Sequence, residues 1–229
     1  MEIKSFTFSA FNDYAPSGIA EALKQCSKNK GIKKTGAPVI VCIGSDLVLG
    51  DSLGPLVGTF LEKEKYNSYV YGTLSAPITA KEVLYTKELL KTVHANNLVI
   101  SIDAAVGDDE DVGLIRVANC GLKPGLGVAK SLGVIGDISI MGIVAGRSNK
   151  NYNLFNLTRL GFVYKMAQVI MGGIKEFLST SPYHNTLEPT PATSNLKQIF
   201  APNEEDFCPQ KFPLKENNVD NNGTFLFGS

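Results

Sequence analysis

The chain is long enough to form one well-buried domain. It has 229 residues, of which 44% are hydrophobic, and its 22 lysines and arginines equal its 22 aspartates and glutamates. A domain of this size buries most of the surface that its unfolded chain exposes. Because the charges balance, there is no net positive field for a polyanion, and we expect neither nucleic acid nor a membrane surface as a partner.

The cysteines do not suggest a metal or disulfide framework. They stand at positions 26, 42, 120 and 208, without a CxxC motif or a Cys/His cluster of metal-ligand spacing. The sequence also shows no signal peptide and no apolar stretch of membrane-spanning length. We therefore expect a protein of the reducing cytoplasm without a cofactor and without a cysteine-based metal site.

The first half of the chain alternates between helix and strand patterns. Apolar residues at helical spacing predict a helix over 17–28, and PVIVCIG (38–44) is typical of a strand buried on both faces. A second helical pattern covers 53–61, and a second strand is predicted over 69–74. A capping box, Thr-Ala-Lys-Glu, then begins a helix over 79–94.

The second half adds three strands and a long helix. NLVISID (97–103) is the clearest strand pattern, VGLIRVA (112–118) and ISIMGIVA (138–145) follow, and residues 153–178 are helical and apolar on most faces. This order predicts an α/β fold with a mostly parallel sheet, right-handed crossovers and helices on both faces. The last two strands are expected to make the sheet mixed.

The two ends of the chain differ from its middle. Residues 1–178 are predicted to form a single α/β domain, whereas 179–229 is rich in Ser, Thr, Pro and Asn and predicts a flexible tail. The first fifteen residues are rich in Phe and Tyr, and either cover a cleft or pack on the sheet. The apolar helix at 153–178 also predicts association into dimers or larger assemblies.

The loop Gly44–Pro55 joins the first core strand to its helix, at the sheet edge where parallel folds carry ligand sites. Its glycines permit tight turns, and Asp51 lies near the start of the helix, where free N–H groups stabilise a negative charge. Asp51 is either a functional residue or a helix cap. The residues of this loop that we expect to bind a substrate are Gly44, Ser45, Asp46 and Gly50.

Asp103 closes the strand NLVISID and is either a second functional carboxylate or part of an Asx turn. If the strands predicted over 38–44 and 97–103 are neighbours in the sheet, the side chains of Asp51 and Asp103 can lie close together. Two close carboxylates do not both ionise readily, so they can divide acid and base roles around a water molecule, as in amide hydrolysis. The same pair suits an oxygen-bound divalent metal, with Asp46 or Asp137 as a third ligand.

The sequence gives less support to the other candidate functional residues. A glycine-bearing region over 124–140 can bring Lys130 or Asp137 to the same edge to bind substrate, although simple turns are the commoner explanation. His94 lies near a helix end away from that edge and His184 lies in the tail. A Ser-His or Cys-His relay therefore has no well-placed base.

Several ordered motifs resemble those of the YyaC-type sporulation proteins. The resemblance covers roughly residues 38–172 and is carried by IGSDLVLGDSLGPLVG, YGTLSAPITA, SIDAAVG, KPGLGVAK, IGDISIMGIV and LTRLGFVYKMA. That family is similar in turn to the germination protease of spores and, more distantly, to the peptidases that mature nickel-iron hydrogenases. The resemblance implies a three-layer α/β/α fold of the phosphorylase/hydrolase-like type.

The resemblance also implies roles for the two aspartates. Asp51 of GDSLGP and Asp103 of SIDAA match the catalytic acids of the germination protease, which acts on a protein or peptide substrate. The hydrogenase-maturing peptidases hold nickel with the same two positions and a later histidine. This chain has no histidine between residues 95 and 183, so the metal-free spore protease is the nearer model.

The chain departs from its family at two places. Leu47, Val48 and Leu49 stand where related sequences carry a polar Arg-Ser-Thr stretch, and Thr79 stands where they carry histidine. Two hypotheses follow. The first is a sporulation-associated peptidase that uses the two aspartates. The second is a catalytically inactive relative that acts as a binding or regulatory module in sporulation, which the apolar replacements and the long polar tail favour.

Overall fold

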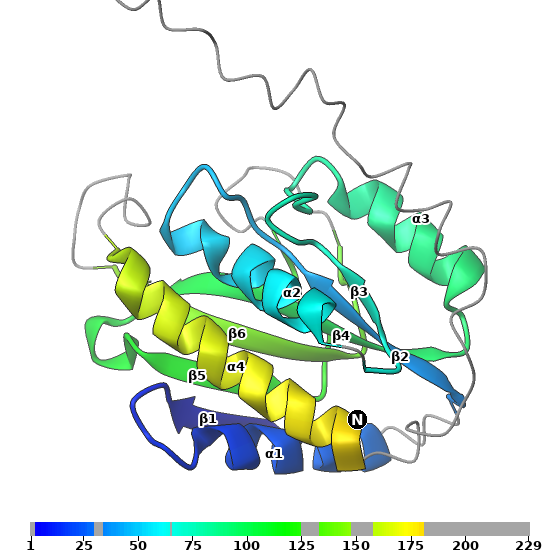
Figure 1. The fold of residues 1–229 in the computed structure, drawn as a ribbon, viewed down its shortest axis with the longest axis horizontal. Helices are drawn as coiled ribbons and strands as arrows, with labels where there is room; N and C mark the ends of the chain where they lie inside the picture. Colours follow the sequence, from blue (N-terminus) through cyan, green and yellow to red (C-terminus); the bar gives the residue numbers. More distant parts are fainter. Residues whose placement is uncertain (1–2, 30–33, 65, 125–132, 148–157, 181–229) are drawn as a thin grey trace, which may run out of the picture.

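The computed structural model has an α/β fold built around a mixed six-stranded sheet (Figure 1). The strand order is β1-β5-β6-β4-β2-β3, in which β6, β4, β2 and β3 run parallel while β5 and β1 are antiparallel to their neighbours. The fold predicted from the sequence is thereby confirmed. The residues that the structure describes are 3–29, 34–64, 66–124, 133–147 and 158–180.

The strands follow the apolar runs of the sequence, because a strand buried on both faces needs continuous hydrophobic residues. Their bounds are β1 (Ser5–Ser9), β2 (Gly36–Cys42), β3 (Tyr69–Tyr71), β4 (Asn97–Gly107), β5 (Leu114–Ala118) and β6 (Ile138–Gly146).

Helices cover both faces of the sheet, which gives three layers (Figure 1). On one face lie α1 (Ala15–Asn29), α2 (Leu53–Lys63) and α4 (Leu160–Thr180), and on the other lies α3 (Val83–Val93). Two short 3-10 turns, at Gly50–Ser52 and Asp109–Asp111, complete the described elements. None of the described helices is long and apolar enough to cross a lipid bilayer.

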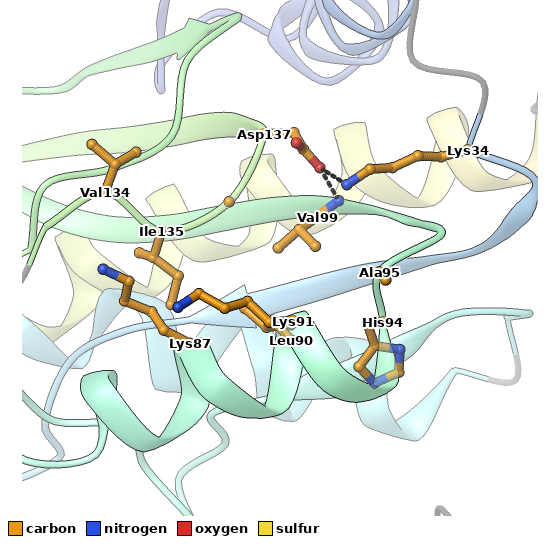
Figure 2. Close-up of a pocket in the computed structure, with 11 residues that line it drawn as sticks. Lys34, Lys87, Leu90, Lys91, His94, Ala95, Val99, Val134, Ile135 and Asp137 are labelled. Carbon is orange, nitrogen blue, oxygen red and sulfur yellow. Dashed lines mark hydrogen bonds and ion pairs between the residues drawn. The ribbon is translucent and has the colours of Figure 1, made fainter.

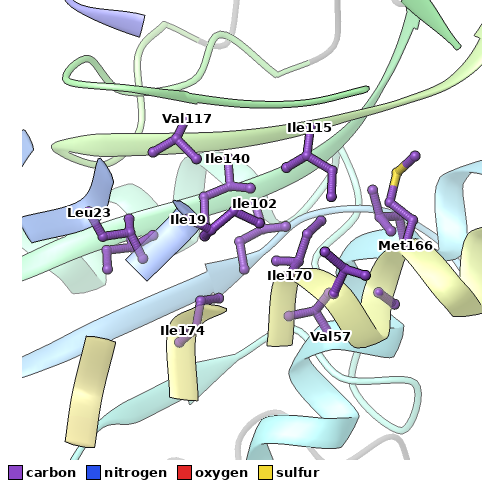
Figure 3. Packing of buried hydrophobic residues seen from close by; sticks show 14 of the residues in the cluster. Ile19, Leu23, Val57, Ile102, Ile115, Val117, Ile140, Met166, Ile170 and Ile174 are labelled. Atoms are coloured by element: carbon purple, nitrogen blue, oxygen red, sulfur yellow. The ribbon is translucent and has the colours of Figure 1, made fainter. Parts of the chain in front are cut away.

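The alternation of side chains along β4 divides the core in two. Leu98, Ile100 and Ile102 are fully buried against α1, α2 and α4, whereas Val99 packs under α3. Figure 3 shows the larger cluster, in which side chains from the sheet meet those of the covering helices. Each fully buried aliphatic side chain contributes about 1.5–3 kcal/mol of hydrophobic stabilisation, so this contact holds the sheet and helices together.

The structure refines several predicted boundaries. The start of the chain forms β1, an edge strand that pairs with β5 and was not predicted, so these residues extend the sheet instead of packing on its face. The strand predicted over 69–74 ends at Tyr71, because Gly72 turns the chain away with a φ of 87°. Helix α4 is described from Leu160, so the start predicted at 153 lies outside the described residues, as does the tail after Thr180.

The predicted capping box is half formed. The Glu82 carboxylate accepts the backbone N–H of Thr79 at 2.9 Å, as expected. The reciprocal bond is replaced, because the Glu82 N–H donates to the main-chain carbonyl of Thr79 and the Thr79 hydroxyl donates to the Glu82 carboxylate. The predicted helix start at residue 79 is wrong, since α3 begins at Val83 with Glu82 in the capping position, and Thr79–Glu82 instead forms a turn before it.

Candidate functional site

The sheet register places Asp103 beside the end of β2. The prediction that Asp103 ends its strand is wrong: β4 continues to Gly107 because β6 pairs with it from Ile100 to Gly107, with Asp103 opposite Met141. On the other side, pairing with β2 stops at Cys42 opposite Ile102. Asp103 is therefore the first residue of β4 after the stretch that pairs with β2. It still lies next to the carboxyl end of β2.

Asp103 belongs to the face of the sheet that α3 covers. Val99 packs in the cluster under α3, and alternation along the strand puts Ser101 and Asp103 on the same face. The Asp103 side chain is half-buried, and its Oδ1 accepts the backbone N–H of Ala104 at 2.9 Å. The carboxyl group is therefore held in place by its own strand.

A glycine at the end of β2 brings Asp51 to the same edge. Gly44 has a φ of 143° and donates its N–H to the Ile78 carbonyl at 3.0 Å, while the Ser45 N–H donates to the Asp51 carbonyl at 3.2 Å. A Cβ at position 44 would overlap that Asp51 carbonyl, and one at Gly54 would overlap the carbonyl of Ile43. Only glycine lets the loop close so tightly.

Asp51 lies in the 3-10 turn that precedes α2. The capping positions of this turn and of α2 are Leu49 and Ser52, and neither start has a side-chain cap hydrogen bond. Asp51 is therefore not the residue that caps the helix, and the alternative of a simple cap is not supported.

The two carboxyl groups influence each other. Burial raises the pKa of Asp103 to about 8, the negative charge of Asp51 contributes to this rise, and the N–H of Ala104 opposes it. Burial also raises the pKa of Asp51, against the effect of the Ser45 N–H. At neutral pH Asp103 therefore favours its protonated form and can act as an acid. Asp51 lies beside it in an environment of its own, so the two carboxyl groups can take different roles.

The other residues predicted for this site fall into three groups. Gly44, Ser45 and Gly50 lie in the loop that carries Asp51, with Gly44 and Gly50 buried and Ser45 half-buried. Asp46 is in the same loop but exposed to solvent. Lys130 lies outside the described residues.

The structure does not bring Asp137 to the aspartate pair. Its Oδ2 accepts from Lys34 Nζ at 2.6 Å and from the backbone N–H of Val99 at 3.0 Å. Val99 precedes Asp103 by four residues, which corresponds to roughly 13 Å along a strand. Within the described part of the chain, no three His, Cys, Asp or Glu side chains are grouped as metal ligands, so the pair gains no third ligand there.

Asp137 has a structural role that can be tested. We expect Asp137→Ala to lower the free energy of unfolding by about 1–2 kcal/mol, because the Val99 N–H loses a charged acceptor inside the sheet. Urea unfolding would measure this change. Asp46→Ala, at an exposed position, is the control and should leave stability within about 0.5 kcal/mol; equal losses in both variants would contradict the prediction.

Two comparisons with known proteins show which family the chain belongs to. The model of a family described as "Protein of unknown function (DUF1256)" matches residues 11–173, and the chain belongs to that family. The chain is also similar to the uncharacterized protein YyaC of Bacillus subtilis (strain 168). The two are 41% identical over 144 residues, which span 62% of this chain and 70% of the relative.

Proposed function

We propose that this protein is a cytoplasmic, sporulation-associated peptidase of the germination protease type, in which Asp51 and Asp103 form the acid/base pair. The observation that carries the proposal is the coupling of the two half-buried carboxyl groups at one sheet edge, with the pKa of Asp103 raised to about 8. Perturbed pairs of this kind are typical of catalytic sites. The resemblance of GDSLGP and SIDAA to the protease motifs supports the choice of reaction.

In this mechanism the ionised carboxylate of Asp51 accepts a proton from a water molecule, whose oxygen attacks the carbonyl carbon of the scissile peptide bond. Asp103, protonated at neutral pH, donates its proton to the leaving nitrogen as the C–N bond breaks. The products are a carboxylic acid and an amine, and transfer of the proton from Asp51 to Asp103 restores the starting state of the pair. The reaction uses no covalent intermediate with the enzyme.

The test is incubation of the purified protein with extracts of sporulating cells, followed by mass spectrometry of the peptides. Defined cleavage products should appear with the wild-type protein and with Asp13→Asn, a change at an exposed aspartate. They should be absent with Asp51→Asn. Identical products from the wild-type and Asp51→Asn proteins would show that Asp51 does not catalyse the cleavage.

The second candidate function is a binding module without catalysis. Leu47 and Leu49, which replace polar residues of the family, are 87% and 40% exposed in the loop before Asp51. Exposed leucines beside a functional site are suited to contact with an apolar segment of another protein. This function predicts that the wild-type and Asp51→Asn proteins retain the same extract protein uncleaved, and that Leu47→Asp loses it.

A further inference from the structure

A pocket of about 350 Å³ lies between α3 and the segment before β6, away from the aspartate pair (Figure 2). Lys34, Lys87, Lys91 and Asp137 are among its lining residues. Lys34 Nζ donates to Asp137 at 2.6 Å, Lys91 pairs with Glu88, and Lys87 has an interaction partner of its own. The described residues of this pocket therefore indicate no class of ligand, and the clearest unused binding feature is the outer edge of β1.

β1 is the outermost strand of the sheet, with β5 on one side and no described strand on the other (Figure 1). Its register with β5 is regular, and at its end the Ala10 N–H donates to the Gly113 carbonyl. Hydrogen-bonded and non-hydrogen-bonded positions alternate along an antiparallel pair, so the even-numbered residues of β1 bond to β5. The N–H and C=O groups of Ser5, Thr7 and Ser9 therefore point to the free edge.

This edge is open to a further strand. Ser5 and Thr7 are exposed, and among the outward main-chain groups in the described part of the chain the Ser9 carbonyl has a partner, the Asn12 N–H at 3.1 Å. Proteins commonly block such edges with charged side chains, proline, a bulge or a very short strand. The other edge strand, β3, has only three residues, whereas β1 has five and contains no charge, proline or bulge.

The sequence of β1 reads the same in both directions, Ser-Phe-Thr-Phe-Ser. When a second copy pairs with it antiparallel about a two-fold axis at Thr7, Thr7 lies opposite its own copy and Ser5 lies opposite Ser9. Every outward N–H and C=O group of the strand then meets a partner. A shifted register leaves some of these groups unpaired, so the strand is best matched by itself.

The aromatic side chains of β1 favour the same register. Phe6 and Phe8 pack against the larger core cluster but stay half-buried, and a Cβ on Gly18 of α1 would lie 2.5 Å from the ring of Phe8. In the two-fold register Phe6 faces Phe8 at non-hydrogen-bonded positions, where side chains approach most closely and aromatic pairs are favourable. Ile3 and Phe11, which are 69% and 67% exposed beyond the two ends of the strand, come to the same ends of the interface.

We propose that two copies of this chain associate through β1, so that their sheets form one continuous sheet across a two-fold axis at Thr7. The association that the apolar residues of 153–178 suggested is thus assigned to a different element. In each copy β5 and β6 separate β1 from β4, which carries Asp103. The interface therefore leaves the aspartate pair uncovered and does not depend on peptidase activity.

The test is sedimentation equilibrium of the full chain over a wide range of concentrations, which should show a reversible equilibrium between monomer and dimer. Thr7→Pro should weaken dimerisation at least about tenfold, because proline lacks the outward N–H but leaves the bonds to β5 intact. Thr7→Lys should do the same, since two like charges would lie opposite each other at the axis. Thr7→Val keeps the N–H and the strand preference, so it is the matched control and should dimerise like the wild-type protein.

A cross-link locates the axis. A short bis-maleimide should join two copies of Thr7→Cys, but not two copies of Lys165→Cys, whose change is at an exposed position of α4; the wild-type protein controls for the native cysteines. Circular dichroism checks that each variant is folded, and Thr7→Lys decides the outcome if Thr7→Pro is not. A chain that is monomeric at every concentration, or a dimer that persists in Thr7→Lys, would overturn the proposal.

Discussion

Asp103→Asn is expected to lower peptide cleavage by about 10²–10⁴-fold and yet to stabilise the folded protein at alkaline pH. The loss of activity follows from the loss of the acid, since a positioned general acid contributes roughly 10²–10⁴-fold. The asparagine side chain has the size of a protonated aspartate, so it fits the same half-buried position without a charge. One substitution should therefore move activity and stability in opposite directions.

The sign of the stability change follows from the raised pKa. Asp103 titrates near 3.8 when unfolded and near 8 when folded, so the folded state binds the proton more tightly. The stabilisation is complete below the unfolded pKa and is lost as the pH rises through 8. Asp103→Asn avoids that loss, and above pH 8 we expect its free energy of unfolding to exceed that of the wild-type protein by about 2 kcal/mol.

Urea unfolding at pH 5, 7 and 9, together with the cleavage assay, would measure both effects. The difference between Asp103→Asn and wild type should grow steadily from pH 5 to pH 9. Asp13→Asn, at an exposed aspartate, should show neither the pH-dependent gain nor the loss of cleavage. A variant that is less stable than the wild-type protein at pH 9 would show that the ionised Asp103 is well accommodated, contrary to its raised pKa.

Gly72→Ala is expected to destabilise the protein by at least about 3 kcal/mol. Gly72 has a φ of 87°, which costs roughly 1–2 kcal/mol for a residue with a side chain. A Cβ at this position would also overlap the main-chain carbonyl of Cys42, and the Gly72 carbonyl already lies against Gly58 of α2. Neither neighbour can move without shifting β2 or α2, so steric strain adds to the cost of the backbone conformation.

Thermal and urea unfolding of Gly72→Ala and of Gly161→Ala make a matched comparison. Gly161 lies in the first turn of α4, and a Cβ there would meet nothing within 4 Å. Because alanine is the better helix former by about 0.5–1 kcal/mol, Gly161→Ala should be neutral or slightly stabilising. Similar losses in both variants would mean that the close approach of Gly72 to Cys42 does not limit stability.

The predicted elements and the observed ones agree where the pattern of the sequence is local. The apolar run at 38–44 and the strand at 97–103 were both found, because a buried strand needs continuous hydrophobic residues whatever its partners. The extension of β4 to Gly107 was not predicted, because residues 104–107 are strand only through their pairing with β6. The turn at Gly72 was missed for the same reason, since the close approach to Cys42 comes from another strand.

At the candidate site, too, the local sequence pattern predicted some features, whereas others depend on contacts between distant segments. Asp51 and Asp103 could be singled out because Asp51 lies in the loop after one strongly apolar run and Asp103 ends another, and strands of a parallel sheet end at one edge. Asp137 follows an equally suggestive glycine turn, yet it lies at the start of β6, where Lys34 pairs with it from 103 residues away. Lys34 and Lys87 were not singled out, because an isolated lysine in a sequence carries no signal of the pocket that it lines.

The sequence by itself did not predict the edge strand β1, but it determined the order of the strands and helices that follow residue 15, and it singled out two aspartates near the ends of apolar runs. These are consequences of hydrophobic periodicity, which depends on neighbouring residues only. The tertiary structure decided that Asp51 lies close enough to act on the charge of Asp103, that burial raises the pKa of Asp103, and which lysines line one pocket. These properties depend on strand register and burial, and both arise from contacts between segments far apart in the chain.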